Sequence, residues 1–302
     1  MAKILVSGIL QRETIVCVDS LPLPSNPIND VKQKIHTSVG GDSYNEAIAL
    51  KWLGDDVKFF SLIGSDENRE VINKPGSEIL LETDYILPKL SATPAAVIFS
   101  DNNRNLQIFE DIKDIRNIEY DSDIFESQLE DAAMLISANA NFCKPLVEKA
   151  FNAGKTVAVN IRNFKYETEK YNSYFLEKSD IIYLSDDTLE EDPYDFLKKI
   201  VTRYDPEIII LGQGAKGLIM YNRDNETYVH YNSVKTNEIV NTVGAGNALF
   251  SCFLHYYAKS WNPTYSIKNA LLFASYKIGF VGTSIGFMTE EQIELWRELI
   301  WK

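Results

Sequence analysis

The run Ile208-Ile209-Ile210-Leu211 is apolar at every position, and a helical pattern from Tyr194 to Tyr204 comes before it. Strands that are apolar on both faces and alternate with helices are typical of a parallel sheet covered on each side by helices. The alternation recurs along the chain. We expect further strands at Ile4 to Gly8, Val57 to Ile63, Met134 to Ser137, Thr156 to Asn160 and Ile181 to Leu184, and helices at Ser43 to Leu53 and Lys144 to Ala153. The pattern predicts a three-layer, Rossmann-like α/β fold with a mainly parallel central sheet.

The rest of the chain has a different character. The carboxyl third is helical, with expected helices at Ala245 to Lys259, Tyr265 to Val281 and Glu290 to Ile300. Alternating apolar residues, prolines and polar turns fill segments within 13–37 and 95–109, which indicates a small antiparallel β lid. No repeat or long linker divides the sequence. We therefore expect one domain over residues 1–302.

The charge of the chain limits its partners. Its formal net charge is -13 and its pI is near 4.8, so nucleic acid and anionic membranes are not expected as partners. No apolar run reaches the roughly 18 residues that a membrane span needs. An anionic ligand would have to be held by local backbone amides or a few basic side chains.

The cysteines and histidines predict neither a disulfide framework nor a metal site. Cys17, Cys143 and Cys252 are odd in number and lie far apart in apolar surroundings, as expected of free thiols in a reducing, cytoplasmic compartment. The three histidines are also far apart, without neighbouring ligand residues at metal-site spacing. We assign no metal ligand.

Two glycine motifs precede expected helices. In Asn241-Thr242-Val243-Gly244-Ala245-Gly246-Asn247, the helix that follows would present free backbone N–H groups and the positive end of its dipole to an anion such as phosphate. In Gly40-Gly41-Asp42-Ser43-Tyr44-Asn45, amides and the Asn45 side chain could bind the hydroxyl groups of a sugar. Each motif alone is also compatible with an ordinary tight turn.

Together, in this order, the two motifs resemble the signature regions of the ribokinase-like (pfkB-type) carbohydrate kinase family. The resemblance continues through Glu13 to Pro22, Asn160-Ile161-Arg162, Gly214 to Gly217, Phe273 to Ser275 and Thr283 to Gly286. It implies a ribokinase-like fold, ATP and Mg²⁺ as cofactors, and ATP-dependent phosphoryl transfer to a hydroxyl of a small sugar or nucleoside. It also suggests a homodimer formed through the lid.

The resemblance assigns roles to particular residues. It implies that Glu13, Gly40, Gly41, Asn45 and Arg162 bind the acceptor. The amides near Gly244, Ala245, Gly246 and Asn247 would stabilise the moving phosphoryl group. The nucleotide would contact Ser185, Gly212, Gly214, Gly217, Thr242 and Ser275.

Several of these positions depart from the family pattern. Asn247 stands where active members carry the Asp that takes the proton from the attacking hydroxyl, and a neutral amide cannot accept a proton near pH 7. Ser185-Asp186-Asp187-Thr188 stands in place of an Asn-x-x-Glu segment linked to Mg²⁺, and Gly212 replaces a Thr. Asn241 replaces an Asp near the monovalent-cation site of potassium-dependent members.

These departures leave three alternatives open. The chain could be a kinase, slowed by the loss of the base or served by another carboxylate such as Glu13 or Asp42. It could be a catalytically inactive pseudokinase or regulatory subunit that binds sugar or nucleotide. It could also be a purely structural subunit, which would respond to no ligand.

Overall fold

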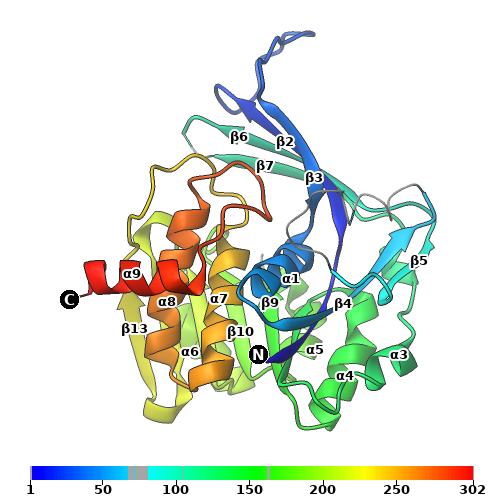
Figure 1. Ribbon diagram of the computed structural model, residues 1–302, viewed down its shortest axis with the longest axis vertical. Coiled ribbons are helices and arrows are strands. Elements are labelled where there is room, and N and C mark those ends of the chain that lie inside the picture. Colours follow the sequence, from blue (N-terminus) through cyan, green and yellow to red (C-terminus); the bar gives the residue numbers. More distant parts are fainter. Residues whose placement is uncertain (1, 67–71, 73–80, 104, 162–163, 302) are drawn as a thin grey trace.

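The computed structural model describes residues 2–66, 72, 81–103, 105–161 and 164–301. Within this part of the chain, nine strands form one sheet in the order β13-β12-β11-β10-β9-β8-β1-β4-β5 (Figure 1). Their bounds are β1 Lys3–Ser7, β4 Asp56–Gly64, β5 Ile86–Leu90, β8 Met134–Ala138, β9 Thr156–Ile161, β10 Ile181–Ser185, β11 Ile208–Gly212, β12 Leu218–Asn222 and β13 Thr227–Tyr231. All neighbours from β5 to β11 are parallel, which confirms the predicted mainly parallel sheet. The antiparallel β12–β13 extension was not predicted.

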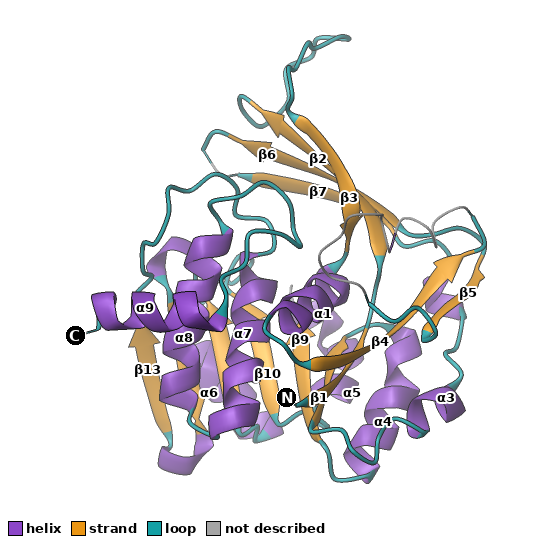
Figure 2. Ribbon diagram, in the orientation of Figure 1, coloured by secondary structure: helices purple, strands orange, loops and turns teal. Residues whose placement is uncertain are grey.

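Helices cover both faces of this sheet (Figure 2). One face carries α1 (Asp42–Trp52), α7 (Ala245–Ser260) and α8 (Pro263–Lys277), with α9 (Glu290–Ile300) packed on α8. The other carries α3 (Ser122–Glu126), α4 (Lys144–Asn152), α5 (Glu169–Leu176) and α6 (Pro193–Tyr204). Ile208 and Ile210 belong to the first hydrophobic cluster and Ile209 and Leu211 to the second. A strand that is apolar on both faces thus contributes alternate residues to two cores.

The predicted helix ends agree with the backbone geometry except in α8. Gly54 and Gly154 follow α1 and α4 with φ of 90° and 65°, the left-handed conformation that glycine adopts at low cost. The helix expected to reach Val281 instead ends at Lys277. Its last turn closes through shorter bonds, from Gly279 N to Tyr276 O and from Phe280 N to Lys277 O, so the helical ladder does not continue.

A second sheet of four strands crosses one end of the large sheet (Figure 1). Its order is β3 (Ile35–Gly40), β2 (Gln11–Val18), β6 (Ala95–Asp101) and β7 (Leu106–Asp111). Ile15 and Ile98 on its inner face pack against Val243. The expected purely antiparallel pairing was wrong for β2 and β6, which are parallel. The reason is that β2 follows β1 and β6 follows β5, and these two strands run in the same direction in the large sheet.

The cysteines and His255 lie in the interior. Cys143 and Cys252 are buried free thiols, and Cys17 is half-buried. His255 on α7 is fully buried, with Nδ1 2.6 Å from Asp55 Oδ2 and Nε2 2.5 Å from Glu290 Oε1. Folding therefore brings two carboxylates to a histidine that had none nearby in sequence. Among the helices described, none combines the length and apolar character that crossing a bilayer requires.

Candidate active site

The two glycine motifs meet where α1 and α7 begin. Gly41 precedes the first residue of α1, and Gly244 precedes the first residue of α7. The Asn247 side chain donates from Nδ2 to Asp42 Oδ1 at 2.8 Å. These two residues are 205 positions apart along the chain, yet their hydrogen bond joins the two helix starts. Polar groups of both motifs can therefore act on one ligand.

The backbone at Gly41 admits no side chain. Its φ of 103° and ψ of 142° lie in a region that is essentially reserved for glycine. A Cβ atom there would also come within 2.4 Å of the Ile9 carbonyl oxygen. The close approach lets the Gly41 N–H donate to Glu13 Oε1 at 2.8 Å. The start of α1 is therefore fixed against the strand that carries Glu13.

Hydrogen bonds fix the orientation of the Asn247 amide. Asn160 Nδ2 donates both to Asn247 Oδ1 at 3.1 Å and to Glu46 Oε1 at 2.7 Å. Asn247 thus accepts from Asn160 while it donates to Asp42. The network joins β9, α1 and α7 beneath the two helix starts.

Glu46 is a buried acid within this network. Burial raises the pKa of Glu46 from 4.5 to about 8, and the nearby charge of Asp42 also raises it, whereas the hydrogen bond from Asn160 lowers it. Its Oε2 atom has no hydrogen-bond partner among the described residues. Since a buried carboxylate with only one of its oxygens hydrogen-bonded is costly to ionise, Glu46 stays protonated near neutral pH.

We expect Glu46→Gln to remove a pH dependence from stability. The unfolded chain releases this proton near pH 4.5 and the folded chain near pH 8, so wild-type stability falls as pH rises through that window. Each unit of pKa difference between the folded and unfolded chain is worth about 1.4 kcal/mol of folding free energy. By pH 8, the free energy of unfolding of Glu46→Gln should therefore have risen by up to about 5 kcal/mol relative to that of the wild type. Urea unfolding at pH 5 and pH 8 measures this. The exposed Glu130→Gln variant serves as control, and equal pH slopes for Glu46→Gln and wild type would contradict the prediction.

Glu13 connects three parts of the fold. It is 3% exposed on β2 and accepts hydrogen bonds from Gly41 N, Gln11 Nε2 at 3.2 Å and Thr283 Oγ1 at 2.7 Å. Burial raises the pKa of Glu13, against the lowering effect of these bonds. Its carboxylate therefore holds the small sheet to the start of α1 and to the loop before α9.

The start of α7 presents amides backed by a buried cation. Ala245 N donates to Thr242 O, and the helical ladder begins with the bond from Ala248 N to Gly244 O at 3.0 Å. The N–H groups of Gly246 and Asn247 come before that ladder. Behind the turn, the fully buried Lys277 donates from Nζ to the Val243 carbonyl oxygen. Burial lowers the pKa of Lys277 from 10.5 to about 8, while Glu13 raises it.

Most of the residues assigned to the nucleotide gather at the ends of β10 and β11. Ser185 and Gly212 are register partners, and Gly214 and Gly217 form the tight turn after β11. Tyr183 joins this group to α7, because Cβ atoms built on Gly212 and Gly246 would lie 2.7 and 2.6 Å from its hydroxyl oxygen.

Other residues singled out from the sequence lie away from these strand ends or already make hydrogen bonds within the protein. Ser275 on α8 donates to Val234 O at 2.8 Å and accepts from Thr236 N at 3.0 Å, so its hydroxyl holds that loop. Arg162 lies outside the described residues. Asp187 accepts a hydrogen bond from Ser185 and Asp186 one from Gln213. The described residues contain no group of three or more His, Cys, Asp or Glu side chains arranged for a metal ion.

Unpaired polar atoms mark the same region. Asn45 Oδ1, Glu46 Oε2, Asn160 Oδ1 and Asn241 Nδ2 are buried and lack hydrogen-bond partners among the described residues. Buried polar groups are normally paired. Their concentration around the two helix starts is what a site for a polar ligand requires.

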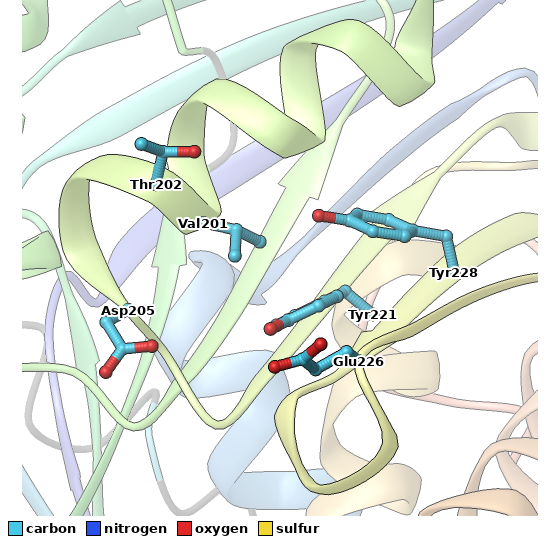
Figure 3. A pocket seen from close by; sticks show the side chains of 6 residues that line it. All are labelled: Val201, Thr202, Asp205, Tyr221, Glu226 and Tyr228. Carbon is cyan, nitrogen blue, oxygen red and sulfur yellow. The ribbon is translucent and has the colours of Figure 1, made fainter.

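A surface depression on the molecule lies well away from these residues. It measures about 460 Å³ and is lined by Val201, Thr202, Asp205, Tyr221, Glu226 and Tyr228 (Figure 3). These side chains come from the end of α6 and from the β12–β13 hairpin. The depression carries none of the residues assigned from sequence, so it does not compete with the paired helix starts.

A comparison with protein families decides the affiliation. The model of the pfkB family carbohydrate kinases matches residues 1–290. The chain belongs to this family. The resemblance expected from the glycine motifs is thus confirmed at the level of the family.

Individual pfkB relatives are distant or similar over a short segment. The chain is 38% identical to the deoxyribokinase of Salmonella typhi over 84 residues, which cover 28% of this chain and 26% of that protein. It is 22% identical to the ribokinase of Dictyostelium discoideum, over 96% of this chain and 99% of the relative. The structure of Arabidopsis thaliana ribokinase complexed with ribose and ATP superposes with a TM-score of 0.79 at 16% identity, over 98% of both chains. This likeness confirms the ribokinase-like fold.

The sequence did not identify all residues of this pfkB site. Glu46, Tyr183 and Lys277 were missed, as was the hydrogen bond from the Thr283 hydroxyl to Glu13. Lys277 left a signal, because it follows Ser266, Ala270 and Phe273 on the buried stripe of α8. A lysine on an apolar stripe indicates a buried charge with a specific partner.

Proposed function

We propose that this pfkB protein transfers the γ-phosphoryl group of ATP to a hydroxyl of a small sugar or nucleoside. The observation that carries the proposal is the contact between the two helix starts through Asn247 and Asp42. One start would hold the acceptor and the other the phosphoryl group. Transfer requires both groups to be close and aligned, and positioning supplies much of the catalysis in phosphoryl transfer.

The acceptor would bind beside Gly40, Gly41 and Asn45. The buried Asn45 Oδ1 lacks a partner among the described residues and would accept from a sugar hydroxyl. Glu13 positions this side through its bond to Gly41 N, and Arg162 is kept as a proposed contact. Acceptor binding by a relative supports the assignment, since the Arabidopsis ribokinase was solved with ribose.

ATP would lie between the ends of β10 and β11 and the start of α7. The residues present fit a nucleotide for two reasons. Gly212 and Gly246 both lie against the Tyr183 hydroxyl, which brings the end of β11 next to the first turn of α7, and the buried charge of Lys277 lies behind that turn. Ser185, Gly212, Gly214, Gly217 and Thr242 are the proposed contacts, and Ser275 would act through the loop it holds. Asp186 and Asp187 would contact the water shell of a magnesium ion carried by ATP. Such an ion neutralises phosphate charge during transfer.

The amides of α7 would act where charge develops. The N–H groups of Gly246 and Asn247 would stabilise the transferring phosphoryl oxygens, aided by the helix dipole. The Ala245 N–H, expected from sequence to share this role, instead donates to Thr242 O. Lys277 holds the Val243 carbonyl and adds a positive charge behind the turn. These groups are fixed before ligand arrives, so little reorganisation opposes the reaction.

We also propose that the small sheet acts as a lid and that two copies pair through its outer face. Ile35, Val97 and Phe109 are exposed there, at 56%, 37% and 56%. Val97 pairs with Phe109 in register, opposite the face that carries Ile98. An apolar sheet face left in water favours association with a second copy.

The test is a thermal-shift screen of sugars and nucleosides with and without Mg-ATP, followed by ADP release with the acceptors that bind. A kinase gives acceptor-dependent ADP release. Stabilisation by ligands without ADP release would identify a non-catalytic binder and refute phosphoryl transfer. No response to any ligand would favour a structural subunit and also refute the proposal.

A further inference from the structure

We infer that Asp42 is the general base of this protein, at the place where Asn247 cannot act. The inference rests on the proposed phosphoryl transfer. It assigns to the start of α1 a step that the family resemblance assigns to the start of α7.

The position of Asp42 fits the role. Its Oδ1 atom lies 2.8 Å from Asn247 Nδ2, one hydrogen bond from the side chain that stands at the family's base position. Asp42 is the first residue of α1, where the helix dipole favours a negative charge. It is partly exposed, unlike the carboxylates behind it. A hydroxyl held next to Gly41 and Asn45 would lie beside this carboxylate.

In this assignment, Asn247 is a positioning residue that orients the Asp42 carboxylate. Its oxygen accepts from Asn160 and its nitrogen donates to Asp42. Both polar atoms of the amide are therefore used within the protein. The amide directs the Asp42 carboxylate and has no basic atom to offer a substrate.

The other carboxylates nearby are unsuited to the step. Glu46 is fully buried, bonded to Asn160 and kept neutral by its raised pKa. Glu13 accepts from Gly41, Gln11 and Thr283 and is 3% exposed. Both are buried, whereas the Asp42 side chain is partly exposed at the start of α1.

The reaction balances with this assignment. The acceptor oxygen forms a bond to the γ-phosphorus, and its proton passes to the Asp42 carboxylate. The bond between the γ-phosphorus and the bridging oxygen breaks, and its electron pair leaves with ADP. Asp42 then releases the proton to water, since its side chain is partly exposed.

The experiment exchanges the two side chains. We compare wild type, Asp42→Asn, Asn247→Asp and the double variant Asp42→Asn/Asn247→Asp in ADP release with an acceptor found in the screen. ADP affinity and melting temperature are measured for each protein. Asp42→Asn should lose about 100- to 10,000-fold in kcat, with ADP affinity within about threefold of wild type. The double variant should recover at least tenfold over Asp42→Asn, because it restores one carboxylate beside one amide.

The single Asn247→Asp variant distinguishes two hypotheses, that Asp42 is the base and that the wild-type protein has no base. It places two carboxylates within hydrogen-bond distance, where they disfavour each other's ionisation, so turnover should not rise. A tenfold or larger gain would show that wild type lacks a base and would overturn the inference. So would Asp42→Asn turnover within tenfold of an active wild type, or a folded double variant no faster than Asp42→Asn. A wild type that binds ATP and acceptor but releases no ADP refutes the proposed function itself, and Asp42 as base with it.

Discussion

Lys277→Met is expected to weaken ADP binding about ten- to a hundredfold. The substitution keeps a long apolar side chain in a fully buried place but removes the positive charge behind the turn at residues 243–247. A lost charge-assisted interaction is worth about 1.5 to 3 kcal/mol, which corresponds to this change in affinity. Calorimetric titration with ADP measures it. Lys198→Met, at an exposed site on α6, changes net charge equally and should bind as wild type does.

The same variant should change how stability depends on pH. The pKa of Lys277 is about 8 in the folded chain and 10.5 in its ordinary state. Below pH 8 both states are protonated, and burial of the charge costs about 3 kcal/mol. The cost disappears as pH rises from 8 to 10.5, so wild-type stability rises relative to Lys277→Met across this window. Unchanged ADP affinity and parallel stability curves would together show that Lys277 is not a buried charge serving the site.

Gly41→Ala is expected to destabilise the protein by about 3 kcal/mol or more. A backbone region closed to residues with a Cβ costs about 1 to 3 kcal/mol, and here the new atom would also meet the Ile9 carbonyl oxygen at 2.4 Å. The chain must shift, and the bond from Gly41 N to Glu13 would be lost. The free energy of unfolding measured in urea should decrease, and so should the rise in melting temperature that the acceptor causes.

Gly54→Ala is the matched control for Gly41→Ala. Gly54 also has a positive φ, 90°, but a Cβ atom there would have no neighbour within 4 Å. We expect a loss of about 1 kcal/mol from backbone strain alone and full acceptor binding. If the two variants were equally stable, contact with Ile9 would not govern the conformation of Gly41.

The central sheet could be predicted from sequence because burial on both faces leaves a local pattern. Ile208 to Leu211 cannot be half-exposed, and a chain that repeats such runs between helices has few alternatives. The helix ends at Gly54 and Gly154 could also be predicted, because each is marked by a glycine in the adjoining sequence. The parallel pairing of β2 with β6 could not be predicted in this way, because it depends on the direction in which β1 and β5 leave the large sheet.

The candidate site was predictable at its turns and not at its side-chain contacts. Glycine motifs at 40–41 and 244–246 precede helices, and each can be recognised alone. The bond from Asn247 to Asp42 joins positions 205 residues apart, so no local pattern contains it. Tyr183 was also hidden, because it is one of several large residues in an apolar strand and only its hydroxyl marks it.

The order in which the polypeptide is synthesised gives α7 and α8 a further importance. Together with α1, these helices cover one face of the large sheet, over strand residues such as Ile4, Ile136 and Ile181. A ribosome-bound chain that has not yet reached residue 245 therefore leaves the part of that face beneath α7 and α8 bare, and uncovered apolar sheet favours aggregation. Nucleotide could not protect it, since the amides proposed to bind phosphate belong to the missing helix. The nascent polypeptide is therefore exposed to aggregation until α7 and α8 have been synthesised.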